Sequence, residues 1–117
     1  MQLTEVTYAG QPPVDSYGPG FFRVMDVIHE GHLFLSAAGV EPWAGWQDVA
    51  PILARAGEFD ILFAGMGPDI APVPAAAKEA LEAAGIAIEP MSSPSACRTY
   101  NILLSEGRRV AIAAVAL

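Results

Sequence analysis

Two short apolar runs constrain the fold more than any other feature of the sequence. Residues 59–64 and 109–116 are almost wholly apolar, without the alternation of polar and apolar side chains that marks a strand with one face in water. Runs of this kind are typical of strands that are buried on both faces of a sheet. Residues 86–90 predict a further strand between them. These strands are expected to form the centre of the domain.

Helical patterns alternate with these strands in the second half of the chain. Helices are predicted at residues 48–56 and at residues 93–105. Residues 70–74 lead into a third predicted helix, which ends at about residue 84. The resulting order is helix, strand, helix, strand, helix, strand. Such an order predicts an α/β sheet with parallel crossover connections.

The first half predicts strands and loops instead. The expected elements are an edge strand at residues 3–8, a loop at 10–20, strands at 21–28 and 33–37 joined by a turn at 29–32, and a break at 39–45. Residues 21–37 are therefore expected to form a β-hairpin that is appended to the α/β sheet.

Composition excludes several classes of protein. The chain has 117 residues, of which 53% are hydrophobic and 16% charged, so we expect one domain with a well-filled core and part of its surface covered in a homo-oligomer. The net charge of −7 argues against nucleic acid and anionic membranes as partners. No apolar run approaches the roughly 20 residues that span a bilayer. The start of the chain lacks signal-peptide character and the single cysteine suits a reducing compartment, so a cytoplasmic location is expected.

The predicted helix at residues 93–105 carries the most distinctive side chains. Ser93 followed by Pro94 is a helix-start signal. At the spacing of an α-helix, the apolar residues of this segment share one face and polar residues lie on the opposite face. The apolar stripe comprises Ala96, Cys97, Tyr100, Leu103 and Leu104, and the polar side comprises Arg98, Asn101 and Ser105.

Two of these residues allow alternative interpretations. Cys97 lies near a helix N-terminus beside Arg98, which lowers a thiol pKa and would suit a nucleophile, but its apolar stripe favours a buried, inert cysteine. Arg98 could form an anion site with Asn101 and the Ser92–Ser93 hydroxyls. It could instead pair with an acid such as Glu106 or one from the hairpin, or with carbonyl groups at strand ends. We favour this structural pairing.

Other motifs in the sequence give weaker evidence for a functional site. The Gly65-Met66-Gly67 loop follows a buried strand but lacks the third glycine of a dinucleotide motif, so a tight turn is favoured, although the loop could line a cleft beside Arg98. His29 and His32 have no third metal ligand beyond Glu30, so no metal or cofactor is expected. Trp43 and Tyr17 could belong to the core or to an aromatic patch for a partner.

Several stretches together resemble one known family. They are YGPGFFRV (17–24), the segment around Trp43, FAGMG (63–67), AAGIAIEPMSS (83–93), and ACRTYN (96–101) followed by EGRRVAIAAV (106–115). The sequence is similar to the small family of unknown function that includes the mitochondrial complex I assembly factor three and an adipogenesis-associated vertebrate protein. The resemblance implies a single three-layer domain over residues 1–117, in which a central mixed sheet carries helices and an appended β-hairpin. It implies no established enzymatic activity or cofactor, and its mitochondrial members resemble assembly proteins that act through protein contacts.

Two hypotheses from different classes follow. The first is a non-catalytic interaction or assembly module, which docks on itself and on another protein through the hairpin side and the loops around Trp43 and Arg98. The second is a small enzyme or anion-binding protein whose site uses Cys97, Arg98 and Asn101. The candidate binding residues are Arg98, Asn101, Cys97, Ser93, Tyr17, Trp43, Gly65 and Gly67. An open pocket around residues 97–101 would favour the second hypothesis.

Overall fold

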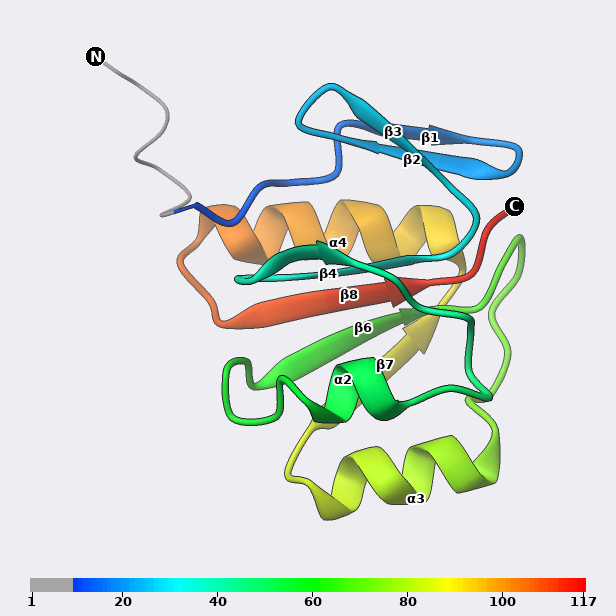
Figure 1. Cartoon of the computed structure of the whole chain (residues 1–117), viewed down its shortest axis with the longest axis vertical. Helices are drawn as coiled ribbons and strands as arrows, with labels where there is room; N and C mark the ends of the chain where they lie inside the picture. The colour runs from blue at the N-terminus through cyan, green and yellow to red at the C-terminus, as the bar shows by residue number, and fades with distance from the viewer. Residues whose placement is uncertain (1–9) are drawn as a thin grey trace.

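A five-stranded mixed sheet forms the centre of the computed structural model, which describes residues 10–117 (Figure 1). Its strands are β4 (Leu33–Ser36), β5 (Gly39–Glu41), β6 (Ile61–Gly65), β7 (Ala87–Met91) and β8 (Val110–Ala114), in the order β5-β4-β8-β6-β7. β6 pairs in parallel with both β7 and β8, whereas β4 runs antiparallel to β5 and β8. All five residues of β8 are buried, as the absence of polar alternation predicted.

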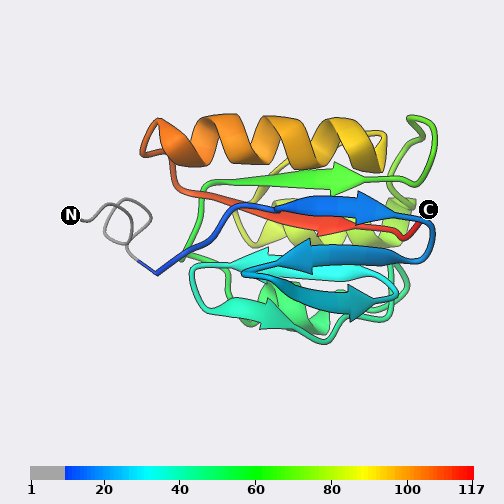
Figure 2. The same ribbon diagram turned by 90° about the horizontal axis from the view of Figure 1, so that it is seen from above.

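Two layers cover the sheet. Helix α4 (Ser93–Ser105) lies on one face beside a second, three-stranded sheet of β1 (Ser16–Gly18), β2 (Phe21–Val24) and β3 (Val27–Glu30), as Figure 2 shows from above. Helices α2 (Ala50–Leu53) and α3 (Ala75–Ala83) cover the opposite face. The predicted fold class, a single three-layer α/β domain with a central mixed sheet, is confirmed.

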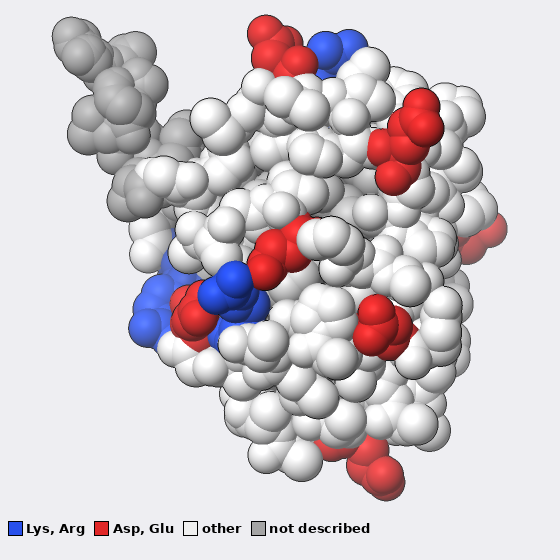
Figure 3. Space-filling view, viewed as in Figure 1, with Lys and Arg blue, Asp and Glu red and all other residues white. Residues whose placement is uncertain are grey.

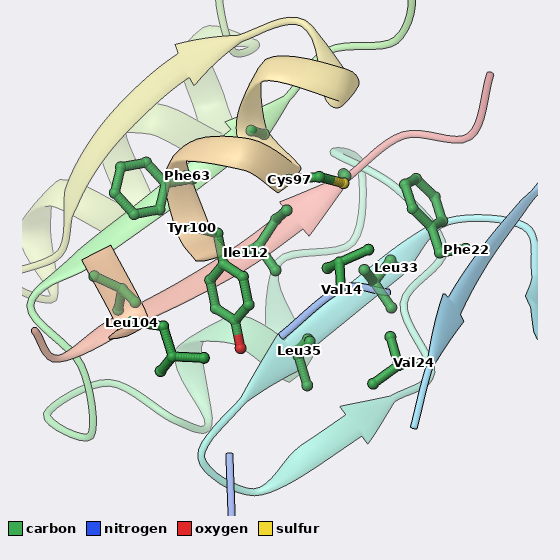
Figure 4. Packing of buried hydrophobic residues seen from close by; sticks show 13 residues of the cluster. Val14, Phe22, Val24, Leu33, Leu35, Phe63, Cys97, Tyr100, Leu104 and Ile112 are labelled. Carbon is green, nitrogen blue, oxygen red and sulfur yellow. The ribbon is translucent and has the colours of Figure 1, made fainter. Parts of the chain in front are cut away.

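Each face of the central sheet has its own core. Figure 4 shows the first, in which Cys97 and Tyr100 of α4 meet Ile112 of β8 and Phe22 of the small sheet. The Tyr100 hydroxyl donates a hydrogen bond to the carbonyl oxygen of Pro12 at 2.8 Å. The second core packs both tryptophans against α2 and α3. Apolar residues of β8 alternate between the two cores, because successive strand side chains point to opposite faces.

The hairpin prediction is wrong in its position. Residues 21–28 do not form one strand, because Met25 (φ 50) and Asp26 (φ 65) make a tight turn that pairs β2 with β3. Residues 29 and 30, predicted as part of that turn, belong to β3, and residues 31–32 carry the chain from β3 to β4 in the central sheet. Two-residue hairpin turns with both φ values positive favour Asn-Gly, so Met-Asp gave no signal of a turn. The Asp26 backbone N–H donates to the Asp15 carboxylate at 3.0 Å, which stabilises the turn locally.

Other boundaries also differ from the predictions. The predicted loop at 10–20 contains β1, the predicted break at 39–45 contains β5, and the helix predicted at 48–56 is regular only over α2. The edge strand predicted at 3–8 lies outside the described residues. β1 and β5 have only three residues each, too few for a period to stand out in the sequence. Within residues 10–117, none of the helices combines the length and apolarity needed to cross a bilayer.

Candidate functional site

Ser93, at the start of α4, is hydrogen-bonded to the residues that follow two strands, β6 and β8. Its backbone N–H donates to the Gly67 carbonyl at 2.7 Å, and its hydroxyl accepts from the Gly67 N–H at 2.9 Å. The same hydroxyl donates to the Val115 carbonyl at 2.6 Å. The carboxyl end of a parallel sheet is where α/β proteins usually bind ligands. Here Ser93 closes that end with internal hydrogen bonds.

Gly65 brings β6 into direct contact with α4. A Cβ atom at Gly65 would lie 2.7 Å from the Ala114 Cβ and 2.8–2.9 Å from Ser93 atoms, closer than packed carbon atoms approach. Gly67 has φ +101, a left-handed conformation that suits glycine. The glycines therefore serve close packing and a turn, in agreement with the tight turn favoured for this loop.

The helix cap lies one residue earlier than predicted. Ser92 is the N-cap, since its hydroxyl accepts from the Ser95 N–H at 3.3 Å, and Ser93 is the first residue of α4. Both serines precede Pro94, so the sequence alone did not distinguish them. The hydroxyl of Ser93 is directed to the strand ends instead.

Cys97 points into the first core, where it is 2% exposed. Desolvation by burial raises the pKa of its thiol to about 12 and outweighs the opposing charge of the neighbouring Arg98. A thiol in this environment stays protonated near neutral pH and is a poor nucleophile.

We expect this buried thiol to make the protein less stable at alkaline pH. An unfolded thiol loses its proton near pH 9.0, whereas the folded one keeps it up to about pH 12. The free energy of unfolding should therefore fall as pH rises between these values, because the unfolded state then binds fewer protons. Urea denaturation across this range should show the decline, and Cys97→Ala should reduce its slope. Alkylation of native Cys97 as fast as in a urea-unfolded control would contradict the buried thiol.

Asn101 binds the segment that leads into β1. Its Oδ1 accepts from the Val14 N–H at 2.8 Å, and its Nδ2 donates to the Val14 carbonyl at 2.9 Å. Both ends of the amide are thus engaged within the chain, where they hold the small sheet against α4.

Arg98 lies on the exposed side of α4. Its Nη2 donates to the Ser95 hydroxyl at 3.2 Å, and no ion pair of Arg98 is found among residues 10–117, including the predicted one with Glu106. Cys97, Arg98 and Asn101 therefore point to the core, to solvent and to Val14 respectively. They do not face one another as the members of one pocket would.

These contacts predict a contrast between two neighbouring substitutions. Asn101→Ala should lower the free energy of unfolding by about 1–3 kcal/mol, because both backbone groups of Val14 lose their partner. Arg98→Ala should change it by less than about 0.5 kcal/mol, since the side chain is exposed. Urea denaturation followed by tryptophan fluorescence measures both. A larger loss for Arg98→Ala would contradict the assignment.

Trp43 belongs to the second core. It is 6% exposed, its Nε1 donates to the Asp48 carbonyl at 2.8 Å, and its ring meets Trp46 edge-on with centroids 4.8 Å apart. Of the two interpretations left open for Trp43, the structure places it in the core. Tyr17 is half-buried against the first core.

An exposed apolar cluster lies on the β2–β3 hairpin, where the sequence indicated a continuous strand. Met25, Val27 and Ile28 are 69%, 54% and 50% exposed. They are three of the six exposed large hydrophobic residues in the described part of the chain, and they fall within four positions. We name Met25, Val27 and Ile28 the hairpin cluster. The missed turn at Met25-Asp26 concealed it, because a continuous strand would have buried one of its faces.

Beside the hairpin cluster, β3 and β5 border two hollows of about 300 and 410 Å³. Both are walled by residues of β3 and β5, and they share His29 and Val40. We call the two hollows together the β3–β5 groove. Figure 3 shows a face of the molecule that is largely uncharged, with isolated acidic side chains and basic ones gathered mainly toward one side.

The fold and the closed strand ends define a class: a small three-layer α/β domain built around a mixed sheet. The chain belongs to the family described as proteins of unknown function, DUF498/DUF598, which it matches over residues 14–115. It is 50% identical over 113 residues to an uncharacterised protein of Rhodobacter capsulatus, an alignment that covers 97% of this chain and 91% of the relative.

Solved structures share the fold. A crystal structure described as an outer membrane protein from Bartonella henselae is 30% identical with a TM-score of 0.84, covering 92% of this chain and 97% of the other. An NMR structure from Rhodopseudomonas palustris is also 30% identical, with a TM-score of 0.75 and coverage of 99% and 92%. A Bordetella pertussis protein described as an Mth938-like domain is 24% identical with a TM-score of 0.76, covering 99% of this chain and 91% of the other. At this level of identity, the similarity shows a shared fold alone.

Proposed function

We propose that this chain is a non-catalytic protein-interaction module of the cytoplasm, which docks a partner protein through the hairpin cluster and the β3–β5 groove. The observation that carries the proposal is the concentration of exposed apolar side chains at Met25, Val27 and Ile28. Exposed apolar side chains that border a groove are characteristic of protein contact sites. The resemblance to an assembly-factor family supports the same function.

The backbone at the hairpin tip adds support. Met25 and Asp26 both have positive φ, which costs residues other than glycine about 1–2 kcal/mol each. Strain of this kind is often found where a side chain has a functional role. Met25 at this tip presents a flexible, polarizable side chain to solvent, and such residues suit adaptable interfaces.

If the turn is strained, substitutions that suit its backbone should stabilise the protein while removing the exposed Met25 side chain. The double variant Met25→Asn/Asp26→Gly should raise the free energy of unfolding by about 1 kcal/mol, because Asn-Gly suits this turn. Its urea midpoint should increase with no change in slope. Met25→Gln, which keeps the strain and removes the apolar group, is the matched control and should leave the midpoint unchanged. An unchanged or lower midpoint for the double variant would contradict the strain argument.

The alternative, an enzyme or anion-binding site on α4, has less support. Its cysteine is buried with a raised pKa, its asparagine is occupied by Val14, and Ser93 is occupied by Gly67 and Val115. Docking through the loop around Trp43 has less support for a similar reason, since that side chain fills the core.

Site-specific photo-crosslinking in cells tests the proposal. A photoreactive residue placed at Met25 should give a discrete protein adduct, which mass spectrometry can assign to a second copy or to another protein. The same residue at Ile70 is a matched control, because Ile70 is 70% exposed, as Met25 is at 69%, but lies outside the hairpin cluster. Equal adducts from both positions, or none from Met25, would refute docking through the hairpin.

A further inference from the structure

We infer that the β3–β5 groove takes an extended peptide segment of the partner, one that carries aliphatic side chains and a lysine or arginine. The inference rests on the proposed function and specifies the chemistry of its partner. Three features of the groove lead to it: two open strand edges, an apolar wall, and an acidic rim.

The strand edges favour an extended ligand. β3 is an outer strand of the small sheet and β5 is an outer strand of the central sheet, so within residues 10–117 each is paired on one side only. Both strands wall the groove. An outer strand offers unpaired backbone N–H and C=O groups, which an added strand can bind. A peptide in the groove would thus extend a sheet by backbone hydrogen bonds.

The wall selects the side chains of that peptide. Val24, Val27 and Val40 line one hollow together with Pro12 and Met25. None of these side chains carries a hydrogen-bonding group, so they suit aliphatic residues at alternate positions of an extended segment.

The rim selects a positive charge. The charged residues that line the two hollows are Glu30 and Glu41, and neither hollow is lined by lysine or arginine. Glu41 is already bound by Arg55, whose Nε and Nη2 lie 2.9 and 2.7 Å from its two oxygens. Glu30 is exposed and forms no ion pair with the other described residues. A basic residue at the Glu30 end would be attracted, and an acidic one repelled, by Glu30 and by the chain's net charge of −7.

Fluorescence anisotropy with synthetic peptides tests the inference on the full chain. The probe is a short peptide of alternating valine and threonine that ends in lysine. Its counterparts replace the lysine by glutamate, or carry N-methyl groups on the backbone. At low ionic strength, the lysine peptide should bind at least about tenfold more tightly than the glutamate peptide. The N-methylated peptide should not bind, because it cannot donate to a strand edge.

Charge reversal supplies the matched controls. Glu30→Lys should invert the preference between the lysine and glutamate peptides, whereas Glu79→Lys on α3 should leave it unchanged. No binding by any peptide, equal binding of the lysine and glutamate peptides, or equal binding of the N-methylated peptide would overturn the inference.

The crosslinking experiment described above distinguishes failure of the peptide inference from failure of the proposed function. An adduct from Met25 to another protein, without peptide binding, would overturn the peptide inference and leave the interaction module standing. An adduct to a second copy, or a link within one chain to residues 1–9, would overturn it by identifying a different occupant. Absence of both adduct and peptide binding would overturn the function as well.

Discussion

Replacing Ser93 with alanine should lower the free energy of unfolding by about 2–4 kcal/mol. The Ser93 hydroxyl accepts from the Gly67 N–H and donates to the Val115 carbonyl, so its loss leaves two backbone groups without partners. A buried backbone group left unpaired costs about 1–3 kcal/mol. Because these groups lie just beyond the ends of β6 and β8, their loss of partners should weaken the contact between α4 and the central sheet. Urea denaturation followed by tryptophan fluorescence measures the change.

The adjacent serine provides the control. Ser92→Ala removes only the cap of α4 and should cost about 1 kcal/mol, as N-cap substitutions usually do. Equal losses for the two alanine variants would show that Ser93 acts as an ordinary helix-start residue, contrary to the hydrogen bonds described above.

Replacing Gly65 with alanine should lower the free energy of unfolding by up to about 3 kcal/mol, the upper end of the cost of overpacking a core. The added methyl group would meet Ala114 Cβ at 2.7 Å and Ser93 Cα at 2.9 Å. Neither atom belongs to a flexible side chain, so β6 and α4 would have to separate. Circular dichroism during thermal unfolding should show a lowered midpoint with the same helical content.

Gly18→Ala is the matched control, since Gly18 also lacks a positive φ. Its Cβ would meet the ring of Phe21 at 2.5 Å. That ring is half-buried and can change rotamer, at a cost of about 1 kcal/mol or less. A Gly18 variant as unstable as the Gly65 variant would show that loss of glycine, rather than the contact with α4, causes the effect.

The closed strand ends and the hairpin cluster together change where function should be sought. The helix at residues 93–105 carries the most distinctive side chains, yet its cysteine, asparagine and first serine all have structural partners. The hairpin carries ordinary aliphatic residues whose distinction is their exposure. Experiments on this family should therefore examine the groove side before the helix.

The local pattern of the sequence determined the α/β architecture. The apolar runs at β6 and β8, the glycine after each helix and the stripe on α4 depend on burial that repeats along the chain, so they are visible without the fold. The cores on the two faces of β8 follow from the same pattern. The sequence also placed Cys97 on the apolar side of its helix, which agrees with its burial.

Only the tertiary structure decided which residues are used internally and which remain exposed. Asn101 was predicted on a polar helix side, but its partner Val14 is 87 residues away along the chain. Ser93 likewise meets Gly67 and Val115, and helical periodicity says nothing about such distant partners. Met25, Val27 and Ile28 are exposed because a turn without glycine or asparagine directs β3 beyond the core. Their exposure depends on how two sheets pack, which no local pattern of residues specifies.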